Sequence, residues 1–261
     1  MKENKALEQF NKLLDIVAKL RGPDGCPWDK EQTHESLLPY FLEEAYEVIE
    51  SVEEKNWDNL KEELGDVMLH LALQWQISAE QKKFSIVDSL ENINKKLIHR
   101  HPHVFGDKKE NVSSEANKNW EDIKHQEKKR ESRLDGVPSS LPALTRAHRL
   151  QQKASSVGFD WDDVNKVWEK FFEEIDELKI AYEIKDQSNI EEEMGDLLFS
   201  VVNLARHLKL DSEDILRRAN RKFIKRFKAV EEELKIRGTD ISKATLAEMD
   251  AIWEQIKREV S

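Results

Sequence analysis

Four acidic residues form two pairs, each with the spacing that turns two helical side chains toward one point. Glu174 and Glu177 are three residues apart, and after 15 intervening residues Glu193 and Asp196 repeat that spacing. Residues three apart share one face of an α-helix, so two facing helices would present four carboxylates to one site. Such a cluster needs cations, and oxygen-only ligation suits hard divalent ions such as Mg²⁺ or Mn²⁺. The pattern predicts a metal site.

The same pattern occurs 130 residues earlier in the chain. There Glu44 and Glu47 precede Glu63 and Asp66 with matching spacing. An internal repeat of this length indicates two copies of one supersecondary unit. We therefore predict a tandem duplication in which the earlier four acids form a second metal site.

The composition predicts an all-α fold built from tandem helical bundles. Charged residues make up 36% of the chain, while Gly and Pro number only 8 and 6, so turns are few and helices long. A loop rich in Gly and Pro is expected at 21–29, and no alternating strand of useful length is present. The expected helices are 3–21, 34–54, 57–81, 86–100, 114–132, 141–156, 163–186, 189–208, 212–236 and 243–259.

The repeat also predicts how the chain divides. Residues 126–140 are nearly all polar and are interpreted as a linker between domains at 1–125 and 141–261. No apolar run would span a membrane, and no signal-peptide pattern precedes the first helix. The single Cys26 cannot form an internal disulfide, so a reduced, cytoplasmic protein is expected. The net charge of −11 argues against binding of nucleic acid or of anionic membranes.

The helix that carries the second acid pair has a polar stripe on otherwise apolar sides. Ser200, Asn203 and His207 continue the line of the acids at spacings of three and four. A polar stripe on a buried helix must find partners. Gly65 and Gly195 stand between the two acids of each second pair, where a mid-helix glycine costs about 1 kcal/mol relative to alanine. Close approach of a backbone or a ligand would explain them, and a helix kink is the alternative.

Basic and aromatic residues follow the acids in both halves. Two pairs four residues apart occur in each half, and their cations could hold phosphate oxygens while the indole stacks on a base. For most of the basic residues at 217–228 the alternative is an exposed face of an amphipathic helix, and Trp253 is as well explained by a core position. Lys170 and Glu192, which adjoin the acids, complete the candidate nucleotide contacts. These candidates are Lys170, Glu192, Lys222, Arg226, Trp253 and Lys257 in the second half, and Lys96, Arg100 and Trp120 in the first.

Together these residues resemble the MazG nucleoside triphosphate pyrophosphohydrolases. The acidic pattern alone is loose, but the resemblance covers nearly the whole chain. It includes the runs 25–33, 100–105, 140–144 and 157–161, and none of the eight acids departs from the pattern.

The resemblance implies hydrolysis of NTPs or dNTPs to the monophosphate and pyrophosphate, with Mg²⁺, by a helical bundle that dimerises. By the family's motif the four later acids are metal ligands, and Lys222, Arg226 and Trp253 contact the nucleotide. Metal ions would neutralise the phosphates and activate a water that attacks the α-phosphorus. Either Glu173 or Glu177 could orient or deprotonate that water, so the expected catalytic residues are Glu173, Glu174, Glu177, Glu193 and Asp196.

Two other functions use similar residues. A metal-dependent phosphatase or nuclease would release different products, and a regulatory module would bind nucleotides without turnover. We also expect the halves to be unequal, with most turnover in the second. Its Lys170 and its denser basic helix suit a triphosphate better than Tyr40 and the His-rich run after Lys96.

Overall fold

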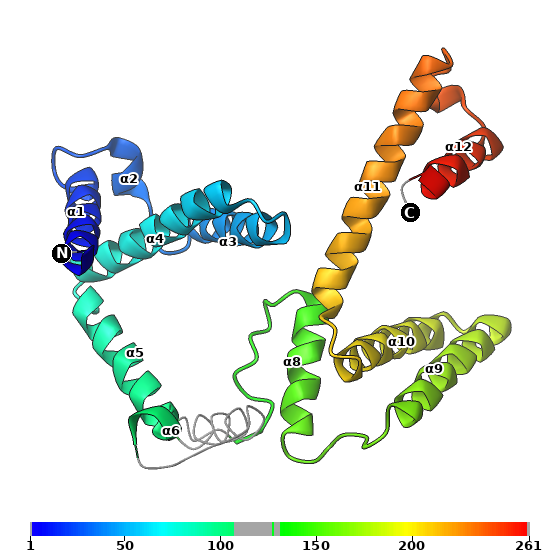
Figure 1. Cartoon of the computed structure of the whole chain (residues 1–261). Coiled ribbons are helices and arrows are strands. Elements are labelled where there is room, and N and C mark those ends of the chain that lie inside the picture. The colour runs from blue at the N-terminus through cyan, green and yellow to red at the C-terminus, as the bar shows by residue number, and fades with distance from the viewer. Residues whose placement is uncertain (1, 107–126, 128–130, 260–261) are drawn as a thin grey trace. The chain divides into compact units, whose positions relative to one another are not determined.

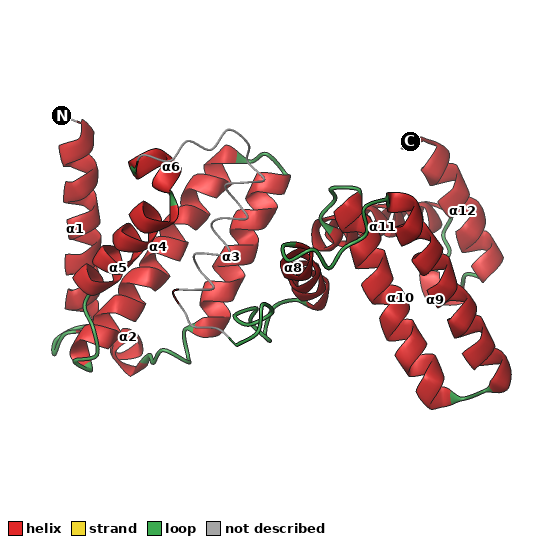
Figure 2. Ribbon diagram, turned by 90° about the horizontal axis from the view of Figure 1, so that it is seen from below, coloured by secondary structure: helices red, strands yellow, loops and turns green. Residues whose placement is uncertain are grey.

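The structure is a computed structural model that describes residues 2–106, 127 and 131–259. All regular elements in these ranges are helices, which confirms the all-α prediction. The chain divides into two compact units, residues 1–120 and 121–261 (Figures 1 and 2). The linker at 126–140 stays a prediction. Its later part contacts the second unit, because the carbonyl of Arg133 accepts a hydrogen bond from the buried Lys153 at 3.1 Å.

The first unit is organised around two adjacent helices. They are α3 (Leu38–Glu53) and α4 (Trp57–Glu80), and α1 (Lys2–Arg21) packs against α4. The core lies between α1 and α4 and contains Val17, Leu37, Leu73 and Ile77. The remaining helices are α2 (Pro27–Glu31), α5 (Ile86–Arg100) and α6 (Pro102–Phe105).

The second unit repeats this central pair of helices. Here α9 (Val164–Ile184) and α10 (Gln187–His207) lie side by side, as Figure 2 shows, and α8 (Ala143–Ser155) packs against α10. The long α11 (Ser212–Ile236) follows, and α12 (Leu246–Glu259) packs on it after the short helix η1 (Ile241–Lys243). A separate apolar core between α11 and α12 is formed by Val230, Leu234 and Ile252.

The same short turn joins the paired helices in both units. Lys55 and Lys185 have a left-handed backbone, with φ of 56° and 58°. The next residue then caps the following helix: Asn56 accepts from the Asn59 amide at 3.2 Å, and Asp186 from the Asn189 amide at 3.3 Å. Such a turn reverses the chain within three residues in the first unit and two in the second, so the two helices of each pair lie against each other.

The described helices agree with the expected ones to within a few residues at most ends. The helix expected at 34–54 begins later, at Leu38, because Pro39 in its first turn cannot continue a helix from upstream. The expected loop at 21–29 was wrong at its end, where α2 begins at Pro27. Most of the helix expected at 114–132 lies outside the described residues. None of the described helices is long and apolar enough to cross a membrane.

Candidate metal and nucleotide site

Three of the four later acids converge in the structure. Glu174 and Glu177 on α9 and Glu193 on α10 each place a carboxylate oxygen within 4.8 Å of the other two. Asp196 follows one turn later on α10 and lies outside this group. Its negative charge still contributes to the electrostatics of Glu193. The facing helices predicted from the spacing thus bring the pairs together, although not all four oxygens meet at one point.

Burial and mutual repulsion shape the protonation of this cluster. Burial raises the pKa of Glu193 above its usual value, and the charges of Glu177 and Glu174 raise it further. A bound divalent cation would offset the repulsion between these negative charges.

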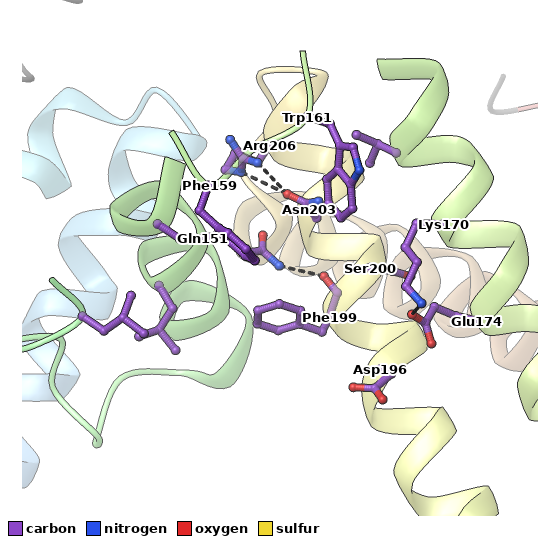
Figure 3. A pocket seen from close by; sticks show the side chains of 14 residues that line it. Gln151, Phe159, Trp161, Lys170, Glu174, Asp196, Phe199, Ser200, Asn203 and Arg206 are labelled. Carbon is purple, nitrogen blue, oxygen red and sulfur yellow. Dashed lines mark hydrogen bonds and ion pairs between the residues drawn. The ribbon is translucent and has the colours of Figure 1, made fainter. Parts of the chain in front are cut away.

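Lys170 supplies a positive charge at the inner edge of the cluster. Its ammonium lies 2.8 Å from the carboxylate of Glu174, which is buried, and 2.8 Å from that of the exposed Glu173. Hydrogen bonds to these two acids raise the pKa of Lys170. The predicted nucleotide contact is therefore engaged with the acids themselves. Figure 3 shows its side chain directed at Glu174.

The first unit builds a related cluster with different neighbours. Glu44, Glu63 and Asp66 have oxygens within 4.8 Å of one another. Burial raises the pKa values of Glu44 and Glu63, and for Glu63 the charge of the nearby Glu47 is the next cause. The predicted second cluster is thus present, with Glu47 beside it rather than within it.

Two substitutions distinguish the first cluster from the second. Tyr40 occupies the position of Lys170, and the buried His70 that of Ser200. The His70 Nε2 lies 3.9 Å from a Glu44 oxygen, and burial lowers the pKa of this imidazole, which favours its neutral form. The lysine that balances the second cluster therefore has no counterpart at this position in the first.

The polar stripe of α10 finds the partners that its burial requires. Asn203 Oδ1 accepts from Arg206 Nε at 3.2 Å and from Nη2 at 2.7 Å, and Ser200 donates to the Leu197 carbonyl at 2.8 Å. His207 Nε2 lies 3.0 Å from Asp160 Oδ1. In the first unit Gln74 pairs likewise with His34.

A cavity of about 400 Å³ opens beside the second cluster, between α8, α9, α10 and the loop before α9. Figure 3 shows Lys170, Glu174 and Asp196 at one end and Gln151 and Phe159 at the other. Sequence reasoning did not assign Gln151, Phe159, Trp161 or Phe199 to a site. The available signal was the polar stripe of α10, because Asn203 on that stripe also lines the cavity.

The structure does not bring the predicted nucleotide contacts of α11 and α12 to the acids. A helix advances about 1.5 Å per residue, so Lys222 lies about 15 Å along α11 from the end of that helix that adjoins α10. In Figure 1, α12 packs on the part of α11 farthest from α10.

Trp253 is half-buried at the edge of the core between α11 and α12. It packs against the α11–α12 core, its ring centroid is 5.4 Å from that of Phe223, and the Arg226 guanidinium lies 5.9 Å from its ring. The indole also lines a cavity of about 250 Å³, so its contact with a nucleotide stays a prediction. Lys257 is exposed and lies 3.1 Å from Glu254.

Of the remaining candidates, only Glu192 among the described residues adjoins the acids. Lys96 is half-buried and Arg100 buried on α5, which follows the end of α4 opposite to its acids. Trp120 lies outside the described residues. Glu192 is exposed beside Glu193, and its charge helps to raise the pKa of that neighbour.

The mid-helix glycines face open space. A Cβ at Gly65 or Gly195 would meet no atom within 4 Å, and both helices continue through these residues. A close approach by another described part of the chain therefore does not account for them. A ligand beside them and a helix kink both stay predictions.

Comparison with known proteins shows the family of the chain. The profile of the MazG nucleotide pyrophosphohydrolase domain matches residues 32–105 and 162–231. The "nucleoside triphosphate pyrophosphohydrolase/pyrophosphatase MazG" of Thermotoga maritima is 50% identical over 250 residues, covering 95% of both chains. The nucleoside triphosphate pyrophosphohydrolase of Escherichia coli K12 is 44% identical over 261 residues, covering 97% of this chain and 98% of the relative. The "uncharacterized protein YabN" of Bacillus subtilis is 44% identical over 98% of this chain, which spans 53% of that relative. The chain belongs to the MazG nucleotide pyrophosphohydrolase family.

Proposed function

We propose that the chain hydrolyses nucleoside triphosphates, in the ribo or deoxy form, to the monophosphate and pyrophosphate at the acidic cluster of the second unit. The observation that carries this proposal is the convergence of Glu174, Glu177 and Glu193 beside an open cavity. Family membership supports the hydrolase class and the triphosphate substrate. A role in removing unwanted nucleotides from a cytoplasmic pool is part of the proposal, and the free Cys26 is compatible with that location.

The donor set of the cluster fits Mg²⁺, with Mn²⁺ as the alternative. Three carboxylates from two helices offer only oxygen. The pKa of Glu193 is raised by burial and then by the charges of the neighbouring acids, and a cation would offset both effects. Glu174, Glu177 and Glu193 would hold the ion, with Asp196 available one turn away. Such an ion neutralises phosphate charge and lowers the pKa of a bound water.

Lys170 orients two of the acids at this site. Lys170 holds the Glu174 carboxylate in place through its ion pair, and it positions Glu173 in the same way. We assign the orientation of the attacking water to Glu173 or Glu177. Assays of the single variants Glu173→Gln and Glu177→Gln distinguish the two residues. Only replacement of the residue that orients or deprotonates the water should change the pH profile of turnover.

The separation of Lys222, Arg226 and Trp253 from the acids supports a homodimer. Large apolar side chains are exposed on the second unit's helices, among them Trp168, Phe172, Leu198 and Phe223. A second copy that covered these faces could bring its basic α11 to the acids of the first. Light scattering should then give about twice the chain mass of 30.6 kDa. A monomer at micromolar concentration would contradict the dimer.

The decisive experiment measures products. The purified chain is incubated with canonical and deoxy triphosphates, with Mg²⁺ and with EDTA, and pyrophosphate and orthophosphate are quantified separately. We expect pyrophosphate that depends on metal. Orthophosphate alone would indicate a phosphatase, and saturable nucleotide binding without either product would indicate a regulatory module.

A further inference from the structure

We propose that the cavity of the second unit receives the nucleobase, and that Gln151 selects bases that carry an N–H donor on their hydrogen-bonding edge. This inference rests on the proposed function, because it concerns the base of the same substrate. It assigns a specificity-determining role to residues outside the acidic cluster.

The cavity has the size and the polarity for this ligand. Its volume of about 400 Å³ lies within the range of ~300–1,000 Å³ that is common for small-molecule sites. Lys170, Glu174 and Asp196 line one end of the cavity, and Leu150 and Val167 contribute apolar walls. Arg206 lines the other end, where its charge is paired with that of Asp160. A nucleotide whose phosphates lie at the acids would therefore extend its base into the apolar part (Figure 3).

Gln151 carries an acceptor that the protein leaves unused. The side chain is buried, and its Nε2 donates to the carbonyl of Phe199 at 2.9 Å. A carbonyl can only accept, so this bond sets which end of the amide is nitrogen. The Oε1 is buried and has no hydrogen-bond partner among the described residues. Buried acceptors without a donor are destabilising, and a ligand N–H in the cavity would satisfy this one.

Aromatic side chains are held at the mouth of the same cavity. Phe159 is 82% exposed and Trp161 is 40% exposed, although both line the cavity. A phenylalanine this exposed gains little from folding, and its face remains available for a planar ligand. Stacking of this kind accepts any base, so it adds affinity and leaves selection to Gln151.

A partly exposed ion pair connects the loop that carries these rings to α10. Asp160 lies between Phe159 and Trp161, and its carboxylate receives two hydrogen bonds from Arg206, at 2.8 and 2.6 Å. Burial would raise the pKa of Asp160, but the bonds and charge of Arg206 outweigh it and lower that pKa. The aspartate is therefore ionised at neutral pH, and Arg206 keeps the loop against α10.

Matched substrates with and without one donor test the selection. ATP is compared with purine riboside triphosphate, which lacks the amino group, and UTP with N3-methyl-UTP, which lacks the ring N–H. For the wild-type chain we expect kcat/KM to fall about tenfold or more within at least one pair, as for loss of one buried hydrogen bond. Gln151→Leu should remove most of that ratio by slowing the donor-bearing substrate.

Two further variants keep the test decisive. Gln152→Leu changes the adjacent amide on α8, which does not line the cavity, and should keep the wild-type ratio. Phe159→Ser alters an exposed residue, so folding should persist. It should raise KM for all four substrates without changing the ratios.

The outcomes separate this inference from the proposed function. Absence of pyrophosphate with every triphosphate would overturn the proposed function. Pyrophosphate release with equal rates within both substrate pairs, or a ratio that Gln151→Leu leaves unchanged, would overturn only the base-selection role. If Gln151→Leu does not fold, an unchanged KM in Phe159→Ser would overturn the placement of the base in this cavity.

Discussion

The Lys170 ammonium lies 2.8 Å from the carboxylate of Glu174, a residue that is only 5% exposed. This pair places a cation against the acidic cluster before any metal binds. A buried carboxylate without a partner is unfavourable, so Lys170 stabilises the metal-free form. The first unit has Tyr40 at the equivalent position, and there burial and neighbouring acids raise the pKa of Glu44.

Replacement of Lys170 by Gln should therefore destabilise the metal-free protein. Because the lysine side chain is 38% exposed, solvent screens the pair, and we expect a loss of about 1 kcal/mol. Differential scanning fluorimetry in EDTA should show a lower Tm, and Mg²⁺ should recover part of the loss. Lys179→Gln is the matched control, since its 3.0 Å pair with Asp176 on the same helix is far more exposed. Equal Tm changes in the two variants would contradict this role for Lys170.

Removal of one ligand charge should abolish turnover without unfolding the chain. Glu193→Gln nearly keeps the shape of the side chain, but it removes a carboxylate that lies within 4.8 Å of two others. We expect pyrophosphate release to fall by orders of magnitude at saturating Mg²⁺, with an unchanged circular dichroism spectrum. Glu191→Gln, an exposed acid two residues earlier, should keep wild-type turnover. Wild-type turnover in Glu193→Gln would remove Glu193 from the metal site.

The protonation of Glu193 also predicts a dependence of stability on pH. Its folded pKa is raised above 4.5, first by burial and then by neighbouring acids, so the folded state binds protons more tightly than the unfolded state. The cost of ionising Glu193 is therefore absent below pH 4.5, and it grows as pH rises through the folded pKa. In EDTA, Glu193→Gln should have a higher Tm than wild type at pH 7.5. This advantage should shrink toward pH 4.5 and disappear in saturating Mg²⁺. A Tm difference independent of pH would contradict this electrostatic account.

The local pattern of acids was enough to predict the paired helices and most of each cluster. A spacing of three and a two-residue turn leave little freedom in how Glu174 and Glu193 can meet. The position of Trp253 could not be predicted in this way. Its position depends on whether α11 continues straight and on where α12 folds back against it. These features of the tertiary structure do not follow from the periodicity of the sequence. Gln151 was missed for a related reason, because its orphaned oxygen arises only when α8 packs against α10.

The two acidic clusters should contribute unequally to turnover. The second has Lys170 against its buried glutamate and an open cavity beside it, whereas the first has the buried neutral imidazole of His70 and the ring of Tyr40. An ordered lysine helps to keep the metal ligands ionised and in place, and the cavity admits a substrate. We compare Glu44→Gln/Glu63→Gln with Glu174→Gln/Glu193→Gln in the full chain and measure pyrophosphate release. The first double variant should keep most of the activity, and the second should lose it by orders of magnitude. If the first abolishes release while the second leaves it intact, the active site belongs to the first unit.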